Sequence, residues 1–109
     1  MNWISLNDQQ QLDQIKELSK TRPQVIFKHS TRCSVSTMAK NRLERNVQPE
    51  QSDFYYLDLL KFRSLSDQVA TDFAVFHESP QVLLIRNTEC VYDESHNGIQ
   101  MDEIVEQLK

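Results

Sequence analysis

Hydrophobic and polar positions follow two different patterns along this chain. Short continuous apolar runs, bounded by turn-forming residues, are typical of buried strands. Such runs predict strands at residues 3–6, 25–27, 54–60, 82–85 and 90–92, and the second strand continues through residues 28–30. Asn87 lies between the last two runs and tolerates a positive φ, so we expect these two strands to form a hairpin.

Apolar residues that recur every three or four positions predict four amphipathic helices between these strands. Their apolar faces comprise Leu12, Ile15 and Leu18 in the first helix, Val35, Met38, Ala39 and Leu43 in the second, Phe62, Leu65, Val69, Phe73 and Phe76 in the third, and Met101, Ile104, Val105 and Leu108 in the last. Asn7 and Asp8 are suited to cap the first helix, and Pro23 ends it. Ser64 and Asp67 predict a capping box for the third helix.

The order of these elements predicts an α/β protein. Strands that alternate with helices build a central mixed β-sheet flanked by helices on both faces. Right-handed crossovers favour parallel pairing of the strands that a helix joins. The length of 109 residues suits one domain over residues 1–109, with a core that needs no disulfide or structural metal.

Composition and charge narrow the class of protein. Apolar residues make up 39% and charged residues 26% of the chain, which is typical of a soluble globular protein. The formal net charge of −4 argues against a general nucleic-acid binder, which needs a basic stripe to neutralise phosphates. No apolar run is long enough to cross a bilayer, and residues 1–5 lack the pattern of a signal peptide. We therefore expect no membrane partner and a cytoplasmic location.

Two cysteines, Cys33 and Cys90, lie far apart in the sequence. This spacing provides no disulfide framework, and the chain has no C-x-x-C motif. The histidines do not stand at zinc-site spacing from either cysteine, so we expect no metal site.

Cys33 is the candidate reactive residue. It lies where a buried strand meets the start of a helix, and a helix N-terminus favours a thiolate, which is the nucleophile in thiol–disulfide exchange. Arg32 adds a neighbouring positive charge, and we expect Lys28 nearby. The alternative for any cysteine is a role as a small buried hydrophobic residue. We prefer that alternative for Cys90, which lies within a predicted strand.

Ser36 and Pro80 fit the same chemistry. Ser36 stands three positions after Cys33, where a dithiol oxidoreductase carries its second cysteine. A serine there can hydrogen-bond a thiolate but cannot form a disulfide, so an external thiol must release the mixed disulfide. Pro80 precedes the buried run at residues 82–85. A cis bond at such a corner frees backbone groups for an extended ligand, although most X–Pro bonds are trans.

Two longer strings of residues carry a family resemblance. The first string is Phe27-Lys28-His29-Ser30-Thr31-Arg32-Cys33, followed by Val35-Ser36, and the second is His77-Glu78-Ser79-Pro80-Gln81, followed later by Ser95-His96. With these strings, and with Trp3 near its start, the chain resembles the monothiol bacilliredoxins of the thioredoxin-like superfamily along nearly its whole length. It departs from that family at Ser34, since a proline usually follows the reactive cysteine. We expect this departure to change the redox poise rather than to abolish activity.

The resemblance implies a thioredoxin-like fold, with Cys33 as the nucleophile and Pro80 as a cis-proline that faces it. It also implies a monothiol thiol–disulfide oxidoreductase that removes the low-molecular-weight thiol bacillithiol from protein mixed disulfides. Bacillithiolated client proteins would then be its partners and bacillithiol its co-substrate, with no tightly bound cofactor.

The same resemblance indicates which residues surround the substrate. Arg32 and Ser36 would support the active site. Lys28 would bind an anionic group, and Ser79 and His96 would border the groove that holds the small thiol. A capping or turn role is an equal alternative for His96.

Two alternatives to a monothiol enzyme stay open at this point. A thioredoxin-like binding module or redox sensor would also be modified at Cys33 but would not turn over. A dithiol variant would use Cys90 as a distant resolving cysteine, which requires the two Cα atoms to lie within about 7 Å. The sequence does not identify the client proteins, the host thiol or the oligomeric state.

Overall fold

The computed structural model describes all of residues 1–109. Its elements follow in the order β1 (Ile4–Ser5), α1 (Gln9–Leu18), β2 (Gln24–His29), α2 (Ser34–Glu44), β3 (Asp53–Asp58), α3 (Arg63–Asp72), β4 (Gln81–Arg86), β5 (Glu89–Ser95), a short 3-10 helix η1 (His96–Gly98) and α4 (Met101–Leu108). None of these helices combines the length and the apolar character that crossing a bilayer requires.

The five strands form one mixed sheet in the order β1-β3-β2-β4-β5, as the pattern of elements predicts. β1 and β2 both run parallel to β3, whereas β4 pairs antiparallel with β2, and β5 pairs antiparallel with β4. The expectation that helix-joined strands run parallel is therefore wrong for β4. The segment after α3, residues 73–80, brings the chain back to the end of the sheet at which β2 and β3 terminate. β4 therefore starts there and runs in the opposite direction.

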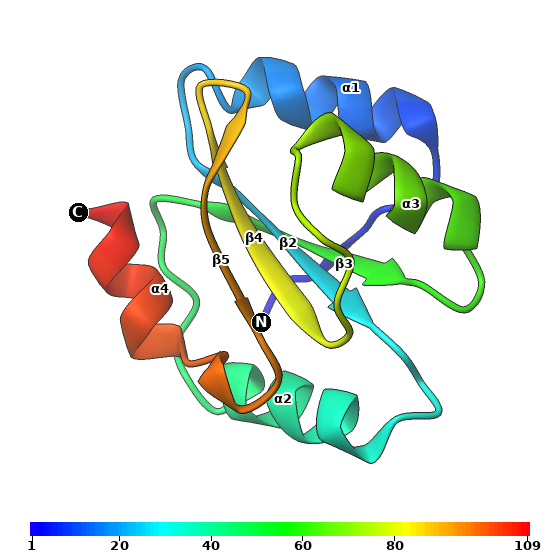
Figure 1. Cartoon of the computed structure of the whole chain (residues 1–109). Coiled ribbons are helices and arrows are strands. Elements are labelled where there is room, and N and C mark those ends of the chain that lie inside the picture. The colour runs from blue at the N-terminus through cyan, green and yellow to red at the C-terminus, as the bar shows by residue number, and fades with distance from the viewer.

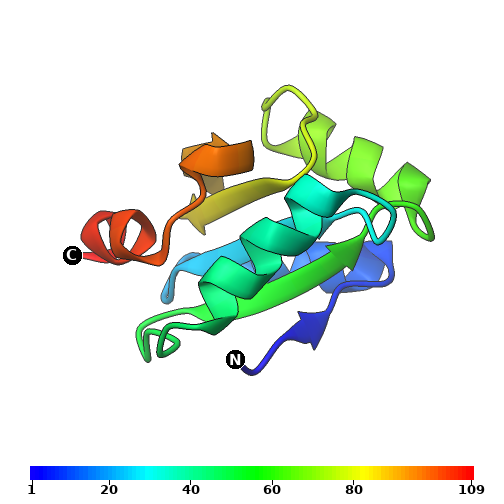
Figure 2. The same ribbon diagram turned by 90° about the horizontal axis from the view of Figure 1, so that it is seen from below.

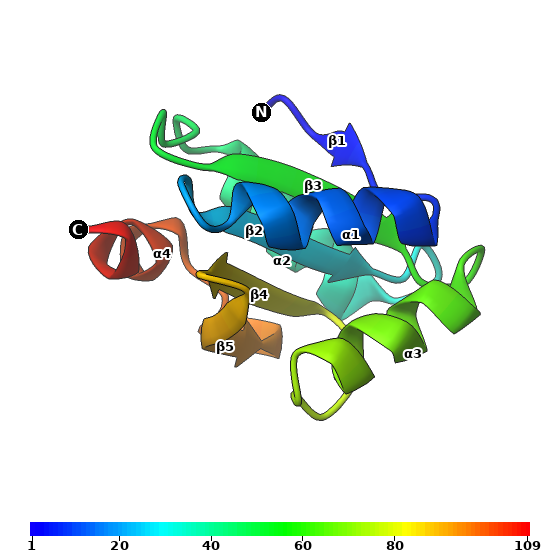
Figure 3. The ribbon, with the colours of Figure 1, turned by 90° about the horizontal axis from the view of Figure 1, so that it is seen from above.

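Helices cover both faces of the sheet, with α1 and α3 on one face and α2 and α4 on the other (Figures 1 and 3). The core under α1 and α3 comprises Leu6, Leu12, Ile15, Ile26, Tyr55, Leu57, Leu65, Val69, Phe73, Leu83 and Ile85. The core on the other face comprises Val25, Phe27, Ala39, Leu43, Phe54, Val82, Leu84, Ile99, Met101, Ile104 and Leu108. Successive residues of β2 thus point to opposite faces. Lys28 therefore points to the α1/α3 side, and His29 points to the α2/α4 side.

The helix caps confirm one prediction and correct another. Asp8 caps α1, and its carboxylate accepts the Gln11 N–H at 2.8 Å. The predicted capping box of Ser64 and Asp67 is wrong, because the N-cap of α3 is Phe62, two residues before Ser64, and it makes no side-chain cap hydrogen bond.

Several apolar residues assigned to helix faces are exposed instead. Phe76 lies beyond the end of α3 and is 94% exposed, because the helix stops at Asp72 and the chain turns away from the core. In α2 the buried apolar stripe is narrow, so Val35 and Met38 remain exposed. Figure 2 shows this helix in front of β2 and β3.

Candidate functional site

The chain turns from β2 into α2 at Cys33, which is the N-cap residue of the helix. Its backbone is extended, with φ −108° and ψ 120°. The Cys33 N–H donates to the Ser30 carbonyl at 3.2 Å, and the Cys33 carbonyl accepts the Thr37 N–H at 3.0 Å. The prediction that Cys33 lies at a strand-to-helix junction is thereby confirmed.

The Cys33 side chain is partly exposed, and its thiol is free. It makes no cap hydrogen bond, although an N-cap side chain usually occupies the unpaired amides of the first turn. The positive end of the α2 dipole is thus available to an anionic sulfur at this position. Arg32, the preceding residue, is exposed to solvent. A reactive cysteine needs this combination of access and positive electrostatic surroundings.

Ser36 occupies the position of a resolving cysteine but does not serve the Cys33 thiol. Its side chain is completely buried. Its hydroxyl oxygen accepts the Ser30 N–H at 3.0 Å and lies 2.6 Å from His29 Nδ1. No hydrogen bond joins the hydroxyl to Cys33. Ser36 therefore supports the site by holding the loop that leads to Cys33, and the expected hydrogen bond to the thiolate is absent.

His29 is the partner that completes this arrangement. Its ring is buried, stacks on Phe27 and packs against Tyr56. Burial, together with the positive charge of Lys40, lowers the pKa of His29 below its usual 6.5. The ring is therefore neutral at neutral pH, and its Nδ1 can accept the Ser36 hydroxyl hydrogen.

Pro80 lies next to the end of β2, the strand that leads into the loop carrying Cys33. The Ser79–Pro80 peptide bond is cis, as the family resemblance implies. Lys28 pairs with Gln81 in the antiparallel register of β2 and β4, so Pro80, which precedes Gln81, lies beside the last residue of β2. The Ser79 hydroxyl is shielded from solvent yet has no hydrogen-bond partner.

The turn after β5 closes the same end of the molecule. The His96 N–H donates to the Pro80 carbonyl at 3.1 Å, which ties this turn to the cis-proline. The His96 ring lies with Nε2 3.7 Å from a carboxylate oxygen of Glu78, and both side chains are about half exposed. His96 thus lies beside the segment from Glu78 to Pro80, which contains Ser79.

Arg42, on α2, is a residue of this region that the sequence analysis does not single out. Its guanidinium donates from α2 to the Ile99 carbonyl at 3.1 Å and to the His96 carbonyl at 3.0 Å. It therefore ties α2 to η1. Nothing in the sequence indicates this link, because the carbonyls that accept from Arg42 belong to the backbone 54 and 57 residues away.

Lys28 does not lie where a substrate anion could meet it. Its side chain is completely buried on the opposite face of the sheet from His29. Its ammonium group donates to the Ser66 carbonyl at 3.1 Å and lies 3.2 Å from His77 Nδ1. The prediction that Lys28 binds an anionic group of the substrate is therefore wrong, since strand alternation turns its side chain toward α3.

Cys90 has the environment of a structural thiol. Burial raises the pKa of its thiol to about 11. In the sheet Cys90 pairs with Ile85, which pairs with Gln24 at the start of β2, whereas Cys33 follows the far end of that strand. Five residue steps along β2 span roughly 16 Å at about 3.3 Å per residue. A Cys33–Cys90 disulfide is incompatible with this separation.

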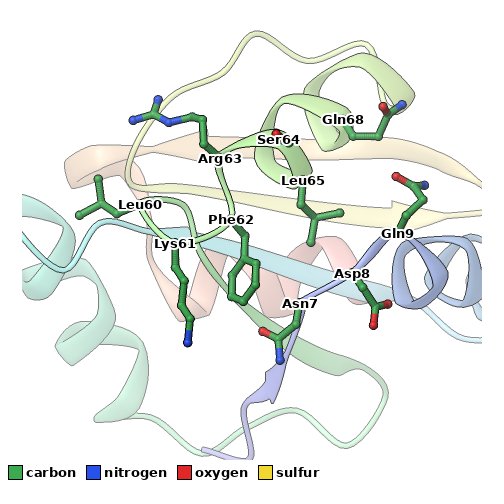
Figure 4. A pocket seen from close by; sticks show the side chains of 10 residues that line it. All are labelled: Asn7, Asp8, Gln9, Leu60, Lys61, Phe62, Arg63, Ser64, Leu65 and Gln68. Carbon is green, nitrogen blue, oxygen red and sulfur yellow. The ribbon is translucent and has the colours of Figure 1, made fainter.

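The cavity in Figure 4 lies apart from these residues. It is bounded by the start of α1 and by the segment from Leu60 to Leu65, and none of the predicted site residues lines it. This cavity is therefore not part of the candidate site around Cys33.

Comparison with known proteins bears on the family and the fold of the chain. The family model described as monothiol bacilliredoxin BrxC matches residues 4–104 of the chain. A solved structure described as a candidate oxidoreductase with a thioredoxin fold has a TM-score of 0.85 and 29% identity, and the match covers 97% of this chain and 93% of that chain. Together these findings support a thiol redox function.

More distant neighbours share the fold. The thioredoxin of Malassezia sympodialis has a TM-score of 0.75 at 14% identity, covering 98% of this chain and 88% of that chain. The thioredoxin of Fasciola hepatica has a TM-score of 0.74 at 17% identity, covering 96% and 98% respectively. The chain therefore has a thioredoxin-like fold, as the resemblance implies.

Proposed function

The chain belongs to the monothiol bacilliredoxin family, and from this premise we propose that it removes bacillithiol from protein mixed disulfides through Cys33. The observation that carries the proposal is the pairing of a free, partly exposed Cys33 thiol at a helix N-cap with a buried Ser36 hydroxyl at the resolving position. An attacking thiol is present, and no second thiol lies within reach of it.

The proposed reaction has two exchange steps. In the first, the Cys33 thiolate attacks the bacillithiol sulfur of the mixed disulfide, the client–bacillithiol S–S bond breaks, and the client leaves as a thiolate that takes up a proton. In the second, the thiolate of another bacillithiol attacks the bacillithiol sulfur on Cys33. Oxidised bacillithiol leaves, and the Cys33 thiolate is restored without any intramolecular disulfide.

Each supporting residue has a distinct part in this proposal. The α2 N-terminus and Arg32 stabilise the Cys33 thiolate as attacking and leaving group. Ser79 borders the groove with its backbone groups, since its hydroxyl is shielded from solvent. His96, held beside Pro80 by its backbone, borders the small thiol. We place this reaction in the cytoplasm, where free thiols such as Cys33 and Cys90 persist.

Intact-mass measurement tests the substrate class. The protein is incubated with oxidised bacillithiol and, in parallel, with oxidised glutathione. We expect a single bacillithiol adduct that is absent in the Cys33→Ser variant and present in Cys90→Ser. Equal or preferential addition of glutathione would overturn bacillithiol as the co-substrate.

A turnover assay separates the enzyme from a redox sensor. A bacillithiolated client protein is mixed with a small fraction of this protein, bacillithiol and a bacillithiol-disulfide reductase. We expect many client molecules to be released per molecule of protein. One release per molecule, followed by arrest as the Cys33 adduct, would leave only the sensor function.

A further inference from the structure

Lys28 is a buried cation inside the α1/α3 side of the molecule. It lies in β2, and no part of its side chain is exposed. Its Nζ donates to the Ser66 carbonyl at 3.1 Å and lies 3.2 Å from His77 Nδ1. A buried ammonium group is unfavourable unless its hydrogens find acceptors. These two contacts are therefore the ones that allow Lys28 to remain in the core.

His77 belongs to the segment that delivers the cis-proline. It stands three residues before Pro80, between the end of α3 and the start of β4. Lys28 pairs with Gln81 across the sheet, so their side chains share one face. Gln81 Nε2 donates to the Phe76 carbonyl at 2.9 Å, and Gln81 Oε1 accepts the Glu78 N–H at 3.4 Å. The side chains of Lys28 and Gln81, which are neighbours on one face of the sheet, thus both contact residues 76–78.

We propose that Lys28 is a positioning residue, which fixes the cis-proline segment opposite Cys33 through its contact with the His77 ring. The inference rests on the proposed function, since it assigns Lys28 a part in binding the disulfide substrate. Lys28 belongs to the first of the two strings that carry the family resemblance and His77 to the second, and the structure brings them into contact. Lys28 therefore acts through the segment and touches no substrate atom.

The direction of the hydrogen bond makes the contact sensitive to acid. A lysine ammonium group only donates, so His77 Nδ1 must accept, and the ring carries its proton on Nε2. His77 is an exposed residue. Partial desolvation, and then the positive charges of Lys28 and Arg63, lower its pKa below the usual 6.5, against the opposing effect of Asp67 and Glu78. Protonation of His77 at more acidic pH places a second N–H opposite the ammonium group, and the contact is lost.

Alkaline pH does not break the same contact. Burial lowers the pKa of Lys28 to about 8, against the attraction of Asp67. The neutral amine that forms above this pH still carries two hydrogens, which suffice for the Ser66 carbonyl and for His77 Nδ1. We therefore expect the segment to loosen only on the acidic side.

The first test compares Lys28→Met with the control Lys16→Met, which removes a lysine that is only partly buried and is paired with Asp72. For bacillithiolated client we expect Lys28→Met to raise KM by about tenfold or more, since displacement of a positioning element has effects of this size. Alkylation of Cys33 by iodoacetamide, which does not use the segment, should stay within about twofold. An unchanged KM in a folded Lys28→Met variant would overturn the proposal.

A second measurement needs no enzymatic activity, so it holds whether or not bacillithiol is the co-substrate. In the wild-type protein at neutral pH, ¹⁵N NMR of the His77 ring should show an unprotonated Nδ1. Amide hydrogen exchange at Glu78 should be at least about tenfold faster in Lys28→Met, since loss of the contact allows local opening. A protonated Nδ1, or unchanged exchange at Glu78, would overturn the positioning role.

The pH profile separates positioning from a merely structural role. His77→Gln retains a side-chain acceptor for Lys28 but cannot be protonated. We expect the wild-type KM to rise as the pH falls below 6.5 and the KM of His77→Gln to stay flat over the same range. A parallel rise in both proteins would show that another group causes the acid sensitivity.

Discussion

At the scale of single residues, the two cysteines differ because their backbones place them differently. Cys33 is a partly exposed N-cap residue, while Cys90 lies in β5 with its thiol donating to the Tyr92 carbonyl. Burial raises the pKa of Cys90 to about 11, so on the order of one molecule in 10⁴ carries the thiolate at pH 7.

Selective alkylation checks this difference. At pH 7 we expect iodoacetamide to modify Cys33 and to leave Cys90 unmodified over the same time, as measured by peptide mass spectrometry. The Cys33→Ser variant should then take up no label. Comparable labelling of both cysteines would contradict the assignment of Cys33 as the reactive thiol.

Ser36 is a second residue whose role the contacts define. Its hydroxyl joins the Ser30 N–H to the His29 ring, so Ser36→Ala leaves two polar groups without a partner. We expect a loss of about 1–3 kcal/mol in the free energy of unfolding, measured by urea denaturation. Ser34→Ala, at an exposed position of the same helix, should change it by less than about 0.5 kcal/mol. Equal effects of the two substitutions would refute the structural role of Ser36.

At the scale of elements, the start of α2 is compatible with the proline that the family usually carries there. Ser34 is the first helical residue, a position where a proline is tolerated because its amide has no intrahelical partner. The extended backbone of Cys33, with ψ 120°, also suits a residue that precedes proline. We expect Ser34→Pro to raise the free energy of unfolding by about 0.4–1 kcal/mol, because the unfolded chain loses freedom. A destabilised Ser34→Pro variant in urea denaturation would contradict this geometry.

The elements also show what the pattern of hydrophobic residues can specify. The apolar runs located all five strands, and the spacing located the helices, because burial imposes those periods directly. The direction of β4 escaped prediction because it depends on the course of residues 73–80. Phe76 was misplaced for the same reason, since the three-to-four spacing continues past the end of α3 into that segment.

At the scale of the whole molecule, the site is assembled from segments that only the fold brings together. Cys33 was identifiable from its own neighbourhood, because a strand followed by a helix start is a local pattern. The contact of Lys28 with His77 spans 49 residues, and that of Arg42 with the His96 carbonyl spans 54. The sequence therefore assigns Lys28 to the substrate, since it shows that Lys28 is near Cys33 along the chain but not which face of the sheet its side chain occupies.

The buried charge of Lys28 also links the stability of the whole fold to alkaline pH. Its pKa is about 8 in the folded protein, against a usual value of 10.5. Between these values the unfolded chain binds more protons than the folded chain, so this group makes the free energy of unfolding rise with pH, by up to about 3 kcal/mol. Cys90 has the opposite effect. Between pH 9 and 11 the folded chain keeps the thiol proton that the unfolded chain loses, so this group makes the free energy of unfolding fall as the pH rises.

These opposing contributions make the difference between two proteins more informative than a single stability curve. Urea denaturation of wild type and Lys28→Met at pH 7.5, 9 and 10.5 isolates the lysine, since the Cys90 contribution is common to both. We expect the stability of wild type relative to Lys28→Met to increase steadily across this range. A constant difference would mean that Lys28 titrates alike in the folded and unfolded chains, which its complete burial beneath the cis-proline segment does not allow.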